Sequence, residues 1–133
     1  MGDFDVVVGA GSFRSTAPDA VHFPHRWTRA GVTVETAFTG AHLLHLAAAG
    51  CVLNDVYREA ERLDVPLDGV RVTAAGGFDT DTWESTGIEY VVDLDSSASQ
   101  ADLDAVLEAA DSTAEIPKSI RAGASVRRVG SSS

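Results

Sequence analysis

The segment that decides the fold is Leu43–Cys51, which reads LLHLAAAGC within a longer run, 41–63, that contains no proline. Apolar residues recur along this run at the spacing of one helix face, at positions 44, 47, 48, 51, 52, 56, 60 and 63. The run therefore predicts a long helix, with Thr39 as its N-cap and Pro66 as the stop signal that follows it. Gly50 costs about 1 kcal/mol relative to alanine inside a helix. It indicates either the close approach of another backbone or plain tolerance.

Segments with strand patterns lie on both sides of this helix. The expected strands are 4–8, 21–27 (interrupted at Pro24), 31–38, 69–75, 87–94 and 124–129. A glycine-rich turn is expected at 9–12. The strands 69–75 and 87–94 are expected to pair in antiparallel fashion, joined by the polar connection 76–86.

Two shorter helices are expected after these strands. One is capped by Ser97 or Ser99 and carries an apolar stripe from Leu103 to Ala110. The other covers 115–121, with a proline in its first turn and a glycine after its end. The chain thus predicts an α+β fold with a single domain over 1–129 and a disordered tail at 130–133.

Composition and charge restrict the classes of function. The 133 residues are 44% hydrophobic, with 20 acidic and 10 basic side chains and a net charge of −10. Such a charge repels phosphate backbones and anionic lipids, so we expect neither nucleic acid nor a membrane as a partner. The acidity is compatible with either a salt-adapted cytosol or a GC-rich genome.

The chain contains a single cysteine, Cys51, and this count bears on the cellular compartment of the protein. It excludes an intramolecular disulfide and a cysteine-rich zinc site. The first residues contain no basic region typical of a secretory signal. We therefore expect a protein of the reducing cytoplasm, without a cofactor.

The central helix and the segment after it resemble a known family. The run 43–51, followed by Asp64–Val72 (DVPLDGVRV), is similar to the signature of the OsmC/Ohr family, in which a long helix that reads L-L-x-x-x-A-x-A-G-C leads into x-P-L-x-G-V-x-V. The resemblance covers about 30–128. It implies an OsmC-like fold, in which antiparallel sheets wrap around a long central helix in an intertwined homodimer. It also implies reduction of organic hydroperoxides or hydrogen peroxide by a cysteine thiol.

The resemblance assigns catalytic positions that this chain matches only in part. The peroxidatic cysteine of the family corresponds to Cys51. The family's glutamate, ten positions earlier, corresponds to Ala41, and its resolving cysteine falls near Ala114. The family's arginine comes from the N-terminal strands, where Arg14, Arg26 and Arg29 are the candidates, with Arg14 and Arg26 preferred.

Peroxide reduction needs a thiolate, because the ionised sulfur is the nucleophile. A free thiol has a pKa near 8.5, so a neighbouring arginine is expected to ionise Cys51 and to polarise the peroxide. The sulfenic acid that results condenses with a second thiol. Because the chain has no second cysteine, that thiol must be external, and the predicted enzyme is a one-Cys thiol peroxidase.

Other interpretations of the same residues stay open. A lone cysteine on the apolar face of an alanine-rich helix often serves only as a small buried side chain. Loss of the family's glutamate and second cysteine favours a catalytically degenerate protein that binds a small apolar ligand or a partner. Candidate pocket residues are Trp27, His42 and Leu44. A metal-binding module is a further alternative, built from His42 and His45 at helical spacing with His22 or His25.

Overall fold

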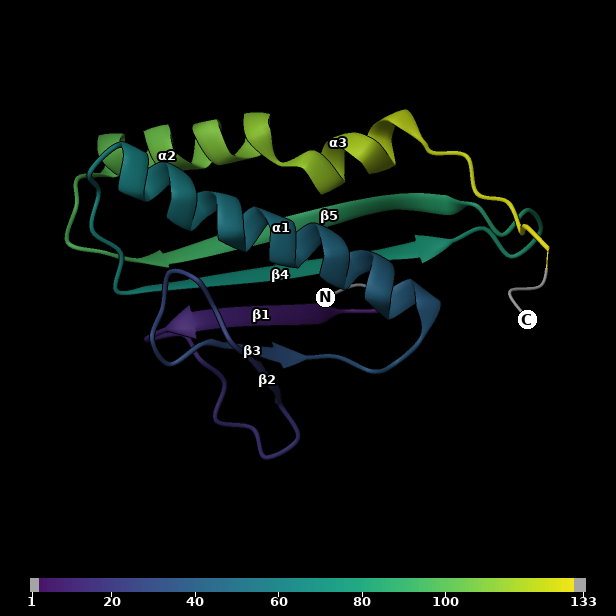
Figure 1. Cartoon of the computed structure of the whole chain (residues 1–133), viewed down its shortest axis with the longest axis horizontal. Coiled ribbons are helices and arrows are strands. Elements are labelled where there is room, and N and C mark those ends of the chain that lie inside the picture. The colour runs from purple at the N-terminus through teal and green to yellow at the C-terminus, as the bar shows by residue number, and fades with distance from the viewer. Residues whose placement is uncertain (1–2, 131–133) are drawn as a thin grey trace.

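The computed structural model describes residues 3–130, which form one antiparallel sheet covered on one face by three helices (Figure 1). The strand order is β2-β3-β1-β4-β5. The strands are β1 (Val6–Gly11), β2 (Val21–Phe23), β3 (Val32–Glu35), β4 (Gly69–Phe78) and β5 (Ser85–Asp95). The predicted antiparallel pair corresponds to β4 and β5, in which Val72 lies opposite Val92. The α+β class predicted from the sequence is confirmed.

The long central helix, α1, spans Gly40–Arg62 and is capped as predicted, because the Thr39 side chain accepts a hydrogen bond from the backbone N–H of His42. It packs across β1 and β4. A Cβ atom added at Gly50 would meet no atom within 4 Å among the described residues. Of the two explanations for this glycine, the structure of the single chain therefore favours plain tolerance.

The remaining helices are α2 (Gln100–Thr113) and α3 (Glu115–Ala122). Of the two predicted caps for α2, Ser99 is the one that accepts the backbone hydrogen bond. Only the buried Ala114 separates α2 from α3, so the two helices follow one another along α1 (Figure 1). No helix within 3–130 has both the length and the apolar character needed to cross a membrane.

Alternation along the inner strands explains the core. Side chains two residues apart point to the same face of a strand, and in β1 and β4 that face is almost wholly valine and alanine. These residues meet the apolar stripe of α1. The principal core residues are Val6, Val8, Ala10, Val70, Val72, Ala74, Ala49, Val52, Leu53 and Val56.

One predicted turn and one predicted strand are wrong. The predicted turn at 9–12 begins too early, because β1 continues to Gly11 and its residues Gly9 and Ala10 pair with both β3 and β4. The predicted strand 124–129 is absent from the described chain, where 123–130 carries no regular structure. Among residues 3–130 no strand pairs with this segment, and Val126 in it is 94% exposed. Part of the predicted tail, 131–133, lies outside the described residues.

His45 is the most unusual core residue of α1. It is fully buried. The centroid of its ring lies 6.3 Å from the ring centroid of Phe4 and 6.3 Å from that of Phe78. Removal from water lowers the pKa of its imidazole, so the neutral form is favoured in the fold. Its Nε2 atom also lies 2.7 Å from the position that a Cβ at Gly76 would occupy. Glycine is therefore required at this point of β4 for the ring to approach the sheet.

Candidate active site

Cys51 lies in the middle of α1, is partly exposed, and lines a groove of about 370 Å³. The groove is bounded by α1 from Ala47 to Arg58, by the loop before β3, and by the start of α3. Its other principal lining residues are Trp27, Asn54, Asp55, Arg58, Glu115 and Ile116.

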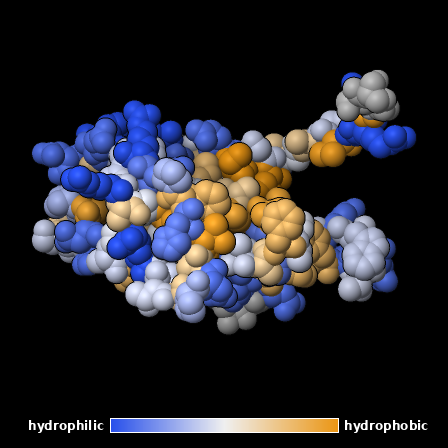
Figure 2. All heavy atoms as spheres, turned by 60° about the horizontal axis from the view of Figure 1, so that its bottom comes forward, coloured by the Kyte–Doolittle hydropathy of each residue, from blue (hydrophilic) through white to orange (hydrophobic). Residues whose placement is uncertain are grey.

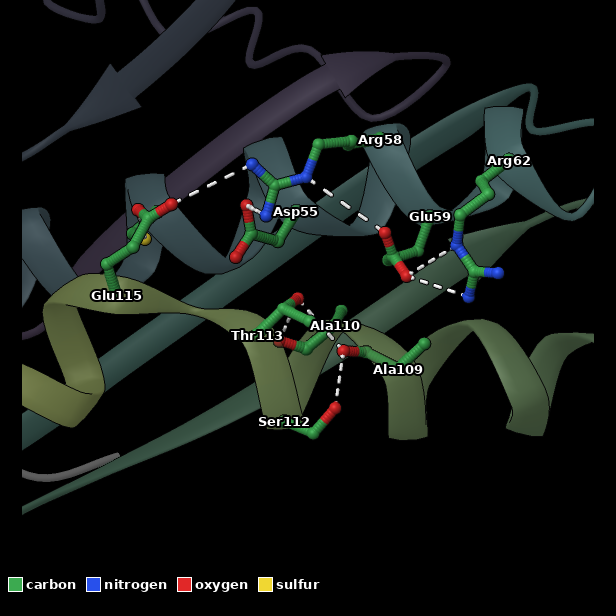
Figure 3. A network of polar contacts seen from close by, with 10 residues as sticks. Asp55, Arg58, Glu59, Arg62, Ala109, Ala110, Ser112, Thr113 and Glu115 are labelled. Carbon is green, nitrogen blue, oxygen red and sulfur yellow. Dashed lines mark hydrogen bonds and ion pairs between the residues drawn. The ribbon is translucent and has the colours of Figure 1, made fainter.

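Helical geometry places three of these side chains together. Asp55 and Arg58 follow Cys51 by four and seven residues, so all three lie on one face of α1. Glu115 comes from α3, and its carboxylate reaches α1 from there (Figure 3). The relative positions of Cys51, Asp55 and Arg58 are therefore fixed by α1 alone, whereas the position of Glu115 depends on how α3 packs against α1.

Arg58 links the two carboxylates. Its Nη2 atom lies 2.7 Å from Oδ1 of Asp55, and its Nη1 atom lies 3.7 Å from Oε1 of Glu115. Its Nε is 4.0 Å from Glu59, which in turn binds Arg62. Figure 3 shows this chain of ion pairs along α1. The guanidinium charge of Arg58 is therefore shared among acidic neighbours.

The thiol of Cys51 points at one of these carboxylates, with its Sγ atom 3.6 Å from Oε2 of Glu115. Burial raises the pKa of the Cys51 thiol, and the negative charges of Asp55 and Glu115 raise it further, although the backbone at Ile116 acts in the opposite sense. The thiol is therefore favoured over the thiolate. This differs from the expectation that a neighbouring arginine ionises Cys51.

The predicted arginines do not line this groove. Arg14 lines a different cavity together with Arg71, beside the turn that follows β1. The guanidinium of Arg26 lies 5.4 Å from the centroid of the Trp27 ring. Arg29 is exposed in the loop before β3. Among residues 3–130, Arg58 is the cation that lines the groove of Cys51.

The three predicted pocket residues are not brought together. Trp27 shares the groove with Cys51. His42 stays at the start of α1, where its ring contacts the Thr39 hydroxyl and packs against the Phe4 ring in a T-shaped pair. Leu44 is half-buried on α1 and does not line this groove.

The histidines do not form the metal site that their spacing suggested. His22 is exposed on β2, and His45 is sealed in the core. His25 uses its two ring nitrogens on Thr28 and Asn54. Within the described chain, no group of three close metal-ligating side chains contains a histidine.

Sequence reasoning missed Asp55, Arg58 and Glu115. The first two carry a usable signal, since their spacing from Cys51 on a predicted helix puts them on the cysteine's face. No local pattern identifies Glu115, because its proximity results from the packing of α3 on α1.

The arrangement of one antiparallel sheet, a long central helix with a cysteine in its middle, and a pair of helices packed beside it defines an OsmC-like fold. A crystal structure of an OsmC-like hydroperoxide resistance protein from Jannaschia sp. CCS1 is similar, with a TM-score of 0.53 and 18% sequence identity, covering 94% of this chain and 92% of that chain. At this identity the likeness shows the fold alone.

The family itself is shown by the sequence. The family described as OsmC-like protein matches residues 33–127. The chain therefore belongs to the OsmC-like family, as the resemblance indicated. No match was found among curated proteins.

Proposed function

We propose that the protein is a one-Cys thiol peroxidase that reduces organic hydroperoxides or hydrogen peroxide through Cys51. The observation that carries this proposal is the position of Cys51, at the family's reactive position and open to a groove that also holds an acid and an arginine. These are the residue types of the family's site, supplied here by Glu115 and Arg58.

The groove suits an organic hydroperoxide in shape and chemistry. Trp27 and Ile116 offer apolar surface for the organic group, while Arg58 offers hydrogen bonds to the peroxide oxygens. Glu115 is placed to accept the thiol proton. The start of α3 lies against Cys51, which supports the correspondence of Ala114 with the family's resolving cysteine.

The reaction can be written with the residues present. The ionised sulfur of Cys51 attacks one peroxide oxygen, the O–O bond breaks, and the alcohol leaves with a proton, which converts Cys51 to a sulfenic acid. An external thiol then forms a mixed disulfide with Cys51 and releases water. A second external thiol displaces Cys51 and leaves as the disulfide of the reductant. Dependence on such a thiol supports a cytoplasmic location in this proposal.

The proposal is tested by treating the reduced protein with cumene hydroperoxide and trapping the product with a sulfenic-acid-specific reagent. We expect one reagent adduct per chain, formed with loss of water and located at Cys51 by peptide mass spectrometry. Cys51→Ser is the matched control and should give no product. An unmodified Cys51 under excess peroxide would reject the peroxidase proposal.

A second candidate function is binding of a small apolar ligand without catalysis. A separate cleft of about 300 Å³ lies between α1, β5 and α3, and its lining includes Ile88, Tyr90, Ile120 and Arg121. Its apolar walls support this alternative, as does the raised pKa of Cys51. It becomes the better explanation if peroxide leaves the cysteine unmodified.

We further propose that the protein is a homodimer, as the family resemblance implies. Several large apolar side chains are exposed on the single chain, including Phe38, Leu43, Trp83 and Val91. Figure 2 shows hydrophobic residues gathered in one area of the face that it presents. Light scattering during gel filtration should give twice the chain mass of 13.9 kDa, and a monomer at micromolar concentration would contradict this.

A further inference from the structure

Three potential metal ligands converge beside the groove. They are the Sγ atom of Cys51 and one carboxylate oxygen each from Asp55 and Glu115, and all three lie within 4.8 Å of one another. Two come from α1 and the third from the start of α3. Thiolate sulfur and carboxylate oxygen are both ordinary zinc ligands.

One carboxylate oxygen of Asp55 is buried without a partner in the described part of the chain. Its side chain is 3% exposed, and its Oδ1 atom is held by Arg58 at 2.7 Å. The other oxygen, Oδ2, is buried and has no hydrogen-bond partner within residues 3–130. A buried carboxylate oxygen without a partner is costly. Asp55 also lines the groove that contains Cys51 and Glu115, and one of its carboxylate oxygens lies within 4.8 Å of the other two ligand atoms.

The distances suit a tetrahedral ion. At the tetrahedral angle, zinc bonds of about 2.3 Å to sulfur and about 2.0 Å to oxygen place these two ligand atoms about 3.5 Å apart. The separation between Sγ of Cys51 and Oε2 of Glu115 is 3.6 Å. The oxygen of Asp55 lies within 4.8 Å of both atoms, and the Glu115 side chain is 69% exposed, so it is free to adjust around an ion.

The charges also balance. One thiolate and two carboxylates give three negative charges, which a divalent ion and the guanidinium of Arg58 together neutralise. Arg58 contacts Oδ1 of Asp55 and Oε1 of Glu115, so Oδ2 of Asp55 and Oε2 of Glu115 need not release it to bind a metal. Arg58 therefore holds both ligands in place from the outer side.

We propose that Cys51, Asp55 and Glu115 form a binding site for one Zn²⁺ ion, with the fourth position open to the groove for water. The thiol proton leaves to solvent as the zinc–sulfur bond forms, and no electron is transferred. The thiolate selects zinc over magnesium and calcium, which prefer oxygen ligands alone. The site goes beyond the proposed peroxidase activity and does not depend on it, but it uses the same sulfur, so zinc and peroxide compete for Cys51.

Calorimetric titration of the chelator-treated, reduced full chain with Zn²⁺, in the absence of peroxide, tests this site. We expect one ion per chain. Cys51→Ser and Glu115→Gln should each weaken the affinity on the order of tenfold or more. Glu115 is exposed, so Glu115→Gln keeps the test valid even if a change at the buried Asp55 disturbs folding. Cobalt(II) in place of zinc should add a thiolate charge-transfer band that Cys51→Ser removes.

The matched control is Glu61→Gln, which removes an exposed carboxylate of α1 that is not among the three ligands. Its affinity should stay within twofold of the natural chain. The absence of stoichiometric zinc binding would overturn the proposal, as would affinity that survives Cys51→Ser. Because the titration contains no peroxide, neither result bears on whether Cys51 forms a sulfenic acid.

Discussion

Exchange of Glu115 for glutamine, alone or together with Asp55→Asn, is expected to accelerate the reaction of Cys51 with iodoacetamide at pH 7 several-fold. Both carboxylates raise the pKa of the Cys51 thiol, so removing their charges increases the fraction of thiolate at neutral pH. Alkylation rates measured from pH 6 to pH 10 check this. In the natural chain the rate should rise with pH to a midpoint above that of a free cysteine, because a raised pKa keeps the sulfur protonated through the neutral range.

The double variant should keep part of the upward shift. Burial is the largest cause of the raised pKa, and amide side chains leave that burial in place. Glu61→Gln serves as the matched control and should react at the natural rate. Equal or slower alkylation of Glu115→Gln would show that the carboxylate does not govern the protonation of the thiol. Circular dichroism of each variant separates this outcome from a loss of structure.

Exchange of Gly76 for alanine is expected to destabilise the fold by about 2 to 3 kcal/mol, within the range typical of overpacked cores. The new Cβ atom would lie 2.2 Å from the carbonyl oxygen of Gly87 on β5 and 2.7 Å from Nε2 of His45. Since the first contact is with backbone, the two strands must separate locally. Urea unfolding at constant protein concentration measures the change in free energy.

Gly50→Ala is the matched control for this substitution. A Cβ atom there meets nothing within 4 Å among the described residues, and alanine is favoured over glycine inside a helix by up to about 1 kcal/mol. Stabilisation is therefore expected. A neutral Gly76→Ala variant would contradict the close packing of β4 against β5 and α1. A destabilised Gly50→Ala variant would instead indicate that a second chain approaches α1 at this glycine.

The periodic parts of the sequence predicted most of the architecture. Apolar spacing over 41–63 located α1. The serine before α2 and the glycine after α3 located those two helices. These signals report burial and capping within one element, so they can be recognised without the tertiary structure. The end of β1 was misplaced because glycines within a strand resemble a turn when the neighbouring strands are unknown. The segment 124–129 has strand composition, but composition alone does not supply a partner strand.

The candidate site was less predictable than the fold. The family resemblance identified Cys51, and helical spacing would have added Asp55 and Arg58. The acidic surroundings of the sulfur depend on Glu115, which is 64 residues away in sequence and approaches only through tertiary packing. The predicted arginines do not line the groove for the same reason, since the turn after β1 sets the position of Arg14 and the loop before β3 sets those of Arg26 and Arg29.

The two carboxylates beside Cys51, those of Asp55 and Glu115, differ in how freely mutation can alter them. Asp55 is built into the interior of α1, so a substitution there is constrained by the stability of the whole chain. The Glu115 side chain projects largely into solvent, so its identity can drift at little structural cost. One surface codon thus offers an evolutionary route for retuning the sulfur while the scaffold beneath it is conserved.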